Sequence, residues 1–246
     1  SGIVDFFIFF KLFIPSIVNY IIPAFVMYFF IPKGMPNTSS DEIKLKRGAK
    51  VIIFLGFFTI FSAVNFHNFL HLPPMLGMMF GFGLLGLYSF YLKITFNENI
   101  DETKFNFLRK VSKAEWDTLL FFFGVILSVG GLGFIGYLTN VSEYLYQGLG
   151  ATYANSLVGI ISAIVDNIPV MFAVITMNPQ MPTEQWLLVT LTTGVGGSLL
   201  SIGSAAGVAL MGHARGHYTF FGHLKWAPVI FIGYVASIYC HILINF

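Results

Sequence analysis

Apolar residues form seven long blocks along the chain, separated by shorter polar segments. The blocks cover residues 12–31, 49–66, 74–94, 117–139, 150–178, 186–211 and 226–245. Most of them approach the roughly 20 apolar residues that a helix needs to cross a bilayer. The pattern therefore predicts an all-α polytopic membrane protein, with about six crossings and one block that does not cross.

The composition supports this fold class. Hydrophobic residues make up 56% of the chain and charged residues 10%, and the mean hydropathy is +0.79, whereas soluble domains carry about 25% charged residues. The net charge of +2 therefore gives little information about partners. We expect the lipid bilayer to surround the protein, and we expect no nucleic acid as a partner. The single cysteine, Cys240, excludes a disulfide framework within this sequence, and we expect it to pack in the last block.

Basic residues alternate between successive connections. The connections 32–48, 93–116 and 212–225, together with Lys50, hold 12 of the 13 basic residues. The connections "HNFLHLPP", "NVSEYLYQGLG" and "NPQMPTEQ" hold none. Since Lys and Arg near span ends are retained on the cytoplasmic side, we expect the first set to be cytoplasmic. Lys11 is expected to snorkel from the outer end of the first block.

This alternation makes block 150–178 enter and leave the membrane on one side. Its centre reads "SAIVDNIPVMFAV", where Pro169 removes a backbone donor and disfavours helix at Ile168. Two arms of about 14 residues each reach about 20 Å, a little past the bilayer midplane. We therefore expect a re-entrant hairpin with Asp166 and Asn167 at its tip. The alternative is one spanning helix with a proline kink and a buried Asp166 satisfied by a neighbouring Ser or Thr.

Block 186–211 is a second irregular segment. Its middle concentrates small and hydroxyl-bearing residues: Thr192, Thr193, Gly194, Gly196, Gly197, Ser198, Ser201, Gly203 and Ser204. Close helix packing would use such residues, and so would a discontinuous helix whose carbonyls and hydroxyls bind a cation. Because the segment directly follows the hairpin, we favour the discontinuous helix. Gly194, Gly196 and Gly197 would then permit the unwound backbone.

Asp166 indicates the chemistry of the site. An ionisable residue at the bilayer centre is energetically expensive and usually marks an ion or substrate pathway. Carboxylate, amide and hydroxyl oxygens are hard donors that suit Na+ or Li+, and one carboxylate that holds either a cation or a proton exchanges them by competition. We predict that Asp166 is this shared carrier. The expected oxygen ligands are Asn167, Thr193, Ser198 and Ser201, with Thr192 and Ser204 as second choices.

Other chemical signals are weaker. His67 and His71 have helical spacing but no third metal ligand nearby. His213, His217 and His223 fall in a connection where a solvated loop is the simpler interpretation and pH sensing the alternative. P-loop, H-E-x-x-H and G-x-S-x-G motifs do not occur. We therefore expect neither an enzyme nor a cofactor, only transported ions.

Four motifs resemble the carboxy-terminal half of NhaD-type sodium/proton antiporters of the ion transporter superfamily. In chain order they are "HLPPMLGMMFGFGLL", "EWDTLLFFFGVILSVGGL", "IVDNIPVMFAV" and "TTGVGGSLLSIGSAAGVALMG". The resemblance implies an inverted-repeat transporter fold in which each repeat ends with a re-entrant hairpin, a broken helix and a final span. It places Asp166 and Asn167 at the hairpin tip and "TGVGGS" at the break.

The same resemblance implies that a first repeat is missing. Residues 1–31 would hold its last helix, residues 32–50 a cytoplasmic linker, and residues 49–246 the second-repeat transport domain. The sequence begins at Ser1 without an initiator methionine, and we expect a fragment of a longer protein in a bacterial inner membrane. The alternative is that a second polypeptide supplies the missing half. Large apolar faces are compatible with a homodimer.

The sequence thus predicts a secondary antiporter that exchanges Na+, or alternatively Li+, for H+. Two rival functions stay open. A carrier of the same fold could transport arsenite or a carboxylate, although an anion site would favour a basic or hydroxyl-rich tip over Asp166. A non-transporting membrane subunit would tolerate a neutral residue in place of Asp166, because removing a buried charge is often harmless.

Overall fold

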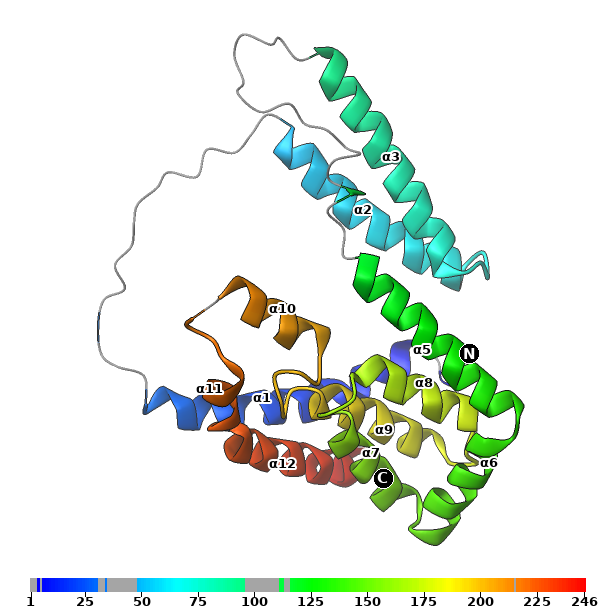
Figure 1. Cartoon of the computed structure of the whole chain (residues 1–246), viewed down its shortest axis with the longest axis vertical. Coiled ribbons are helices and arrows are strands. Elements are labelled where there is room, and N and C mark those ends of the chain that lie inside the picture. Colours follow the sequence, from blue (N-terminus) through cyan, green and yellow to red (C-terminus); the bar gives the residue numbers. More distant parts are fainter. Residues whose placement is uncertain are drawn as a thin grey trace. The chain divides into compact units, whose positions relative to one another are not determined.

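The computed structural model describes residues 4, 6–30, 34, 48–95, 111–112, 116–214 and 216–246. These residues form helices, turns and short connections, with no strand among them (Figure 1). The expected all-α fold is therefore confirmed. The expected cytoplasmic connections 32–48 and 93–116 lie largely outside the described residues, as does Arg215.

The chain divides into two units, which are described separately. One unit comprises Ser1–Gly34 with Asp117–Phe246, and the other comprises Met35–Trp116. The assignment of residues 1–31 to a preceding repeat and of residues 49–246 to a second repeat stays a prediction.

The smaller unit is a pair of antiparallel helices, α2 (Ala49–Asn68) and α3 (Pro74–Thr95). Glycines let the two backbones approach closely. A Cβ atom added to Gly77 would lie 2.5 Å from the Cα atom of Ala63, and one added to Gly81 would clash with Thr59. Small residues at such contacts are how membrane helices pack, because lipid tails supply no hydrophobic drive between helices.

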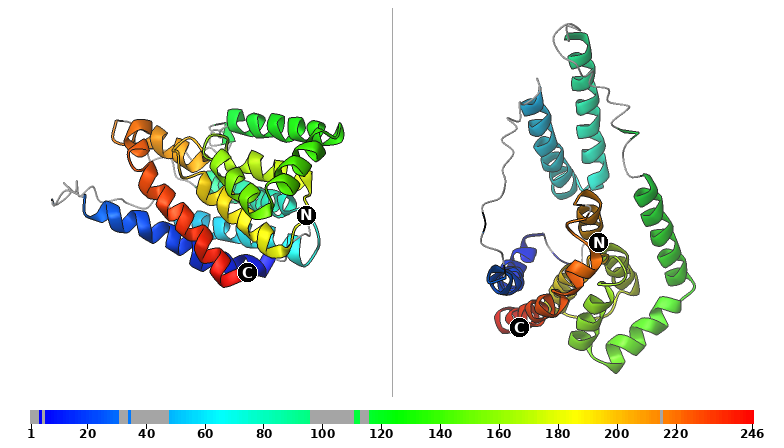
Figure 2. Two further views of the ribbon diagram at one scale, coloured as in Figure 1. Left: turned by 90° about the horizontal axis from the view of Figure 1, so that it is seen from below. Right: turned by 60° about the vertical axis from the view of Figure 1, so that its left-hand side comes forward.

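The larger unit holds the remaining elements. They are η1 (Phe6–Leu12), α1 (Phe13–Tyr28), α5 (Trp116–Phe134), α6 (Tyr137–Ser142), η2 (Glu143–Gln147), α7 (Ala151–Ile161), α8 (Asn167–Met177), α9 (Thr183–Gly196), α10 (Ala205–His213), α11 (Phe220–Leu224) and α12 (Ala227–Asn245). Helices α1 and α12 lie side by side (Figures 1 and 2). A Cβ atom on Gly233 would lie 2.8 Å from the carbonyl oxygen of Asn19, so glycine sets this distance of approach.

Among the described residues, five helical stretches are long and apolar enough to cross a membrane. They are Phe7–Tyr28, Ala49–Asn68, Pro74–Thr95, Trp116–Phe134 and Ala227–Asn245. Block 117–139 ends earlier than expected, at Phe134, because Gly136 adopts a left-handed conformation (φ 80°) that terminates the helix. Blocks 150–178 and 186–211 hold interrupted helices instead of one continuous helix each.

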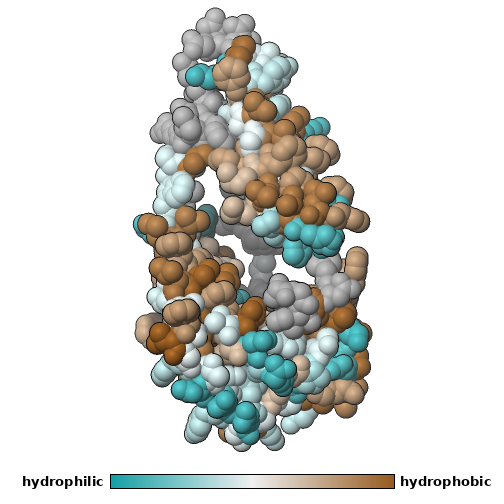
Figure 3. Space-filling model, turned by 90° about the vertical axis from the view of Figure 1, so that its right-hand side faces the viewer, coloured by the Kyte–Doolittle hydropathy of each residue, from teal (hydrophilic) through white to brown (hydrophobic). Residues whose placement is uncertain are grey.

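The outer surfaces of these helices are apolar. Helix α5 contains no buried residue, although it carries Leu119, Phe121 and Phe123, all exposed. Figure 3 shows apolar side chains over much of the visible face. Water would not tolerate this much exposed hydrocarbon, whereas lipid does, so the protein is an integral membrane protein.

The close contact at Gly77 gives a test of the α2–α3 packing. We expect Gly77→Ala to lower the free energy of unfolding by about 1–3 kcal/mol, because the methyl group would meet the backbone of α2. The matched control is Gly83→Ala on the same helix, where an added Cβ atom meets nothing within 4 Å. Thermal unfolding in detergent measures both variants; equal melting temperatures would contradict the packing.

Candidate functional site

The first interruption separates α7 from α8. Each helix has 11 residues and so rises about 16 Å, too short to cross a hydrocarbon core about 30 Å thick. Between them, residues 162–165 form a turn, and Asp166 is the N-cap of α8. Neither helix can span a membrane by itself.

Contacts with α9 show that α7 and α8 run in opposite directions. Along α7, Asn155 bonds Gln185 and the later Ser162 bonds Thr193, so α7 is parallel to α9. Along α8 the order is reversed. Asn167 lies beside Gly197, and the later Met171 lies 3.9 Å from the hydroxyl of Thr193. Helices α7 and α8 therefore form a hairpin whose tip is the turn at residues 162–166.

The second interruption follows α9. This helix ends at Gly196, and α10 begins at Ala205 after Ser204 has capped its first turn. We call residues 197–204 the break. A Cβ atom on Gly203 would lie 2.5 Å from the carbonyl oxygen of Ala163, and one on Gly197 would lie 3.5 Å from the Cβ atom of Asn167. The backbones of the hairpin tip and the break are thus in direct contact.

Asp166 lies next to this contact, and few groups near it could neutralise the charge of its carboxylate. Its side chain is half-buried and accepts one long hydrogen bond, 3.5 Å from the backbone nitrogen of Ile168. Among the described residues, no ion pair involves Asp166. The carboxylate oxygens therefore keep most of their capacity to accept a proton or a cation.

The predicted hydroxyl ligands divide into two groups. The hydroxyl of Thr192 donates to the carbonyl of Asn155 at 2.8 Å, and that of Ser204 accepts from the backbone nitrogen of Gly207 at 3.2 Å. The first bond joins α9 to α7, and the second caps the first turn of α10.

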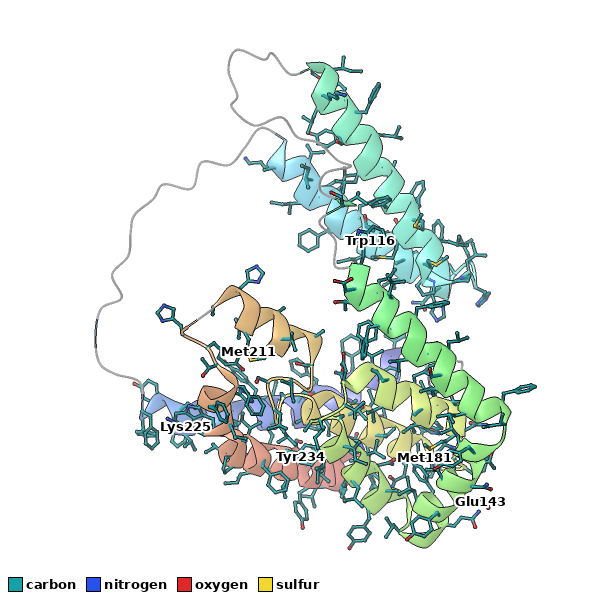
Figure 4. The ribbon with its side chains drawn as sticks, viewed as in Figure 1. Trp116, Glu143, Met181, Met211, Lys225 and Tyr234 are labelled. Carbon is teal, nitrogen blue, oxygen red and sulfur yellow. The ribbon has the colours of Figure 1, made fainter. Side chains whose placement is uncertain are left out.

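The hydroxyls of Thr193, Ser198 and Ser201 bond mainly to groups that are close to them in sequence. Thr193 donates to the carbonyl of Val189 and Ser198 to that of Val195, both at 2.6 Å. Buried Ser201 contacts the sulfur of Met211, labelled in Figure 4, at 3.4 Å. Within the described residues, no hydrogen bond joins Asp166 or Asn167 to any of these hydroxyls.

Three residues expected to interrupt helices are in fact helical. Pro169 and the preceding Ile168 lie in the first turn of α8, where a proline is tolerated because the first backbone N–H groups have no helical partner. Gly194 and Gly196 lie in α9. Gly196 serves packing, since an added methyl group would clash with the carbonyl of Gly159, whereas Gly194 has nothing within 4 Å. Of the three glycines, only Gly197 is in the break.

A buried polar network that sequence analysis missed fixes the hairpin to α9. Asn155, fully buried, donates to the side-chain oxygen of Gln185 at 2.8 Å and accepts from the Tyr146 hydroxyl at 3.0 Å. Gln185 in turn donates to the hydroxyl of Thr152 at 2.6 Å. Burial raises the pKa of Tyr146 to about 12, so this phenol remains a donor in alkaline media. The available signal was an amide inside an apolar block.

Ser162 and Tyr234 also hold the hairpin. The Ser162 hydroxyl shares its hydrogen between the carbonyls of Gly159 (2.7 Å) and Thr193 (3.0 Å). Tyr234 of α12, labelled in Figure 4, donates to the carbonyl of Ser156 at 2.6 Å. The hairpin is therefore bonded to both α9 and α12.

The oxygen chemistry of the tip differs from that of a classical metal centre. Among the described residues, no group of three His, Cys, Asp or Glu side chains could hold a metal ion, and this includes His67 and His71. The hairpin tip and the break carry one carboxylate together with amide, hydroxyl and carbonyl oxygens, a hard donor set that suits soft transition metals poorly.

Comparison with known proteins identifies related transporters. The family model described as "Citrate transporter" (CitMHS) matches residues 1–194. The chain is 53% identical to the Na(+)/H(+) antiporter NhaD of Alkalimonas amylolytica, with all of the chain and 55% of that protein covered. It is 52% identical to NhaD of Vibrio parahaemolyticus, with 95% of the chain and 61% of that protein covered.

A plant protein is a more distant relative. Sodium/proton antiporter 1 of Arabidopsis thaliana is 30% identical over 95% of the chain and 42% of its own length. The chain thus spans about half the length of the relatives it matches. No solved structure matches it.

Two glycines of α9 give a test of how the hairpin is seated. We expect Gly196→Ala to lower the melting temperature of the protein, because the new methyl group would clash with Gly159 and lie 2.5 Å from the hydroxyl oxygen of Ser162. Gly194→Ala, two residues earlier, is the control and should leave the melting temperature unchanged. If the two variants behave alike, α7 does not pack on α9 in this register.

Proposed function

Because the chain belongs to the citrate transporter family (CitMHS), we propose that it is the carboxy-terminal part of a secondary antiporter that exchanges Na+ for H+. Li+ is the alternative cation. Two observations support this proposal: the similarity to sodium/proton antiporters along nearly the whole chain, and a carboxylate without an ion-pair partner where two interrupted helices meet.

The proposed exchange depends on Asp166. In its ionised form it binds the cation, and in its protonated form it releases it, so one carboxylate serves both ions in turn. At the N-terminus of α8 its side chain accepts one long hydrogen bond among the described residues, which leaves its oxygens available for the cation. Movement of the hairpin between two positions would expose Asp166 first to one side of the membrane and then to the other.

The remaining ligands are proposed from the residues around Asp166. Asn167 follows it at the start of α8, Ser198 and Ser201 lie in the break, and Thr193 lies in the last turn of α9. Backbone carbonyls of the break would add further oxygens, because an interrupted helix presents carbonyl groups to a bound ion. Thr192 and Ser204 rank second, since the Thr192 hydroxyl already joins α9 to α7 and the Ser204 hydroxyl already caps α10.

We further propose that the hairpin is re-entrant and that both of its ends face the outside of a bacterial inner membrane. The basic connections 32–48, 93–116 and 212–225 would then be cytoplasmic. Helices α7 and α8 are each too short to cross, which supports the re-entrant arrangement.

A carboxylate carrier is the second candidate, and the family description favours it. Citrate is a polyanion and would require positive charge at its site. Residues 160–207, which contain the tip and the break, include no Lys or Arg. This part of the chain therefore favours a cation, and a citrate gradient in the assay below tests the alternative.

Replacement of Asp166 tests the antiporter. In proteoliposomes containing the full-length protein and a trapped pH dye, Na+ should drive a pH change in the wild type, and Asp166→Asn should abolish it. Because a proton competes with Na+ for the same carboxylate, the apparent affinity of the wild type for Na+ should fall as the pH is lowered. The control is Glu143→Gln, which removes an exposed carboxylate from the same unit (Figure 4) and should leave transport unchanged.

Three outcomes would contradict parts of this account. A wild type that moves no protons with any cation would refute the antiporter, and a citrate-driven signal instead would establish the carboxylate carrier. An Asp166→Asn variant as active as the wild type would leave antiport intact but remove Asp166 from the site.

Cysteine labelling tests the re-entrant arrangement. In a Cys240→Ser background, we expect an impermeant maleimide to label Gly148→Cys and Gln180→Cys in intact spheroplasts, because these exposed positions flank the hairpin. Lys225→Cys should be labelled only after lysis. If Gly148→Cys and Gln180→Cys were labelled from opposite sides, the α7–α8 segment would cross the membrane and the proposed topology would be wrong.

A further inference from the structure

His223 contacts the break from a distant part of the chain. It lies in α11, between α10 and α12, close to Lys225, which is labelled in Figure 4. Its Nε2 atom is 3.0 Å from the carbonyl oxygen of Ser198, and its Nδ1 atom is 2.7 Å from the hydroxyl of Tyr218. The expectation of a solvated loop is therefore wrong for His223, which is half-buried and bonded at both ring nitrogens.

The partners determine where the hydrogens lie. A carbonyl oxygen only accepts, so Nε2 carries a hydrogen and donates it to Ser198. In the neutral ring Nδ1 accepts, and the hydroxyl of Tyr218 donates to it. The two rings also contact each other edge to face, with their centres 5.8 Å apart. Tyr218 thus holds His223 in the orientation and the tautomer that Ser198 requires.

The hydrogen bond from Tyr218 to His223 requires a protonated phenol. Burial raises the pKa of Tyr218, so the phenol keeps the proton that it donates. A histidine that is oriented by a donor on one nitrogen presents a fixed N–H group on the other.

The carbonyl that His223 binds is the second one after α9 ends. Carbonyls at a helix C-terminus have no intrahelical donor, and in a low-dielectric site such a group is left unsatisfied unless a side chain reaches it. The Ser198 hydroxyl donates back to the carbonyl of Val195, while its own carbonyl accepts from His223. Together these two bonds set the direction in which the backbone enters the break.

We propose that His223 is a positioning residue of the cation site, which holds the break in the conformation that presents its oxygens to the ion. The inference rests on the proposed function, because it assigns a role toward the ion that Asp166 is proposed to bind. His223 itself contacts the backbone of the break, and its imidazole would act through Ser198.

The expected consequence is a change in apparent affinity. Without the imidazole the break samples conformations that do not bind the cation, and the apparent affinity falls in proportion to the competent fraction. Loss of one neutral hydrogen bond changes such an equilibrium by about 3- to 10-fold. We therefore expect His223→Ala to raise the KM for Na+ by about this factor, with the maximal rate at saturating Na+ largely retained.

A set of variants separates positioning from other roles. His223→Gln places an amide donor close to the position of Nε2, and we expect it to restore the KM and to keep the pH profile of the wild type. Tyr218→Phe removes the orienting hydroxyl and should raise the KM less than His223→Ala does. His217→Ala, an exposed histidine of the same connection, is the control and should behave as the wild type.

Hydrogen exchange of the full-length protein gives a readout that does not depend on transport. The backbone nitrogens of Leu199 and Gly203 are bonded to the carbonyls of Gly196 and Leu200, so their amides report on the order of the break. We expect faster exchange in peptides covering residues 197–204 for His223→Ala and wild-type exchange for His223→Gln. If the wild type shows no Na+-driven proton movement, the proposed function fails, and this exchange pattern alone decides whether His223 positions the break.

Two results would overturn the inference. The first is a His223→Ala variant with unchanged KM and unchanged exchange. The second is a His223→Gln variant that keeps its KM but loses the pH dependence of the wild type, which would make His223 a titrating group in the proton pathway instead of a positioning residue.

Discussion

Backbone groups at the ends of interrupted helices need hydrogen-bond partners, and hydrocarbon supplies none. This constraint explains the arrangement around the hairpin tip. The carbonyl of Thr193 at the end of α9 accepts from Ser162, the first turn of α10 is capped by Ser204, and the carbonyl of Ser198 accepts from His223. Each of these backbone groups therefore has a partner within the protein, whereas the Asp166 carboxylate accepts one long hydrogen bond among the described residues.

Small residues make this mutual satisfaction possible. The backbone of Gly203 lies against that of Ala163, and Gly196 lies against Gly159. With larger side chains at these positions, the backbones of the tip and the break could not approach so closely. The polar network around Asn155 and Gln185 then holds the opposite end of the hairpin in register. Close backbone packing and a few buried hydrogen bonds thus position one carboxylate.

The sequence was sufficient to predict the spans and the existence of both interruptions. Hydropathy and the alternation of basic connections depend on local composition, which a sequence displays directly. The expected blocks 49–66, 74–94 and 226–245 correspond closely to α2, α3 and α12. The approximate position of each interruption was also predictable. An ionisable residue or a run of glycines within an apolar block is conspicuous in a sequence.

The exact limits of the interruptions were less predictable. Pro169 was expected to end a helix, but a proline in the first turn of a helix is equally acceptable, and α8 already includes it. Gly194 and Gly196 were expected to unwind the backbone, but glycine also serves close packing, which depends on a partner elsewhere in the chain. The contacts of His223 with Ser198 and of Tyr234 with Ser156 join residues far apart in sequence, and no local pattern reveals them.

The central claim is that one carboxylate, Asp166, holds either a proton or a cation, and proton release on cation binding tests it most directly. Na+ would be added to the purified full-length protein in weakly buffered detergent solution, at a pH where the site is protonated, and the released protons would be counted. The account predicts about one proton per bound Na+ and no release from Asp166→Asn. Binding of Na+ without proton release, or equal release from the variant, would contradict it.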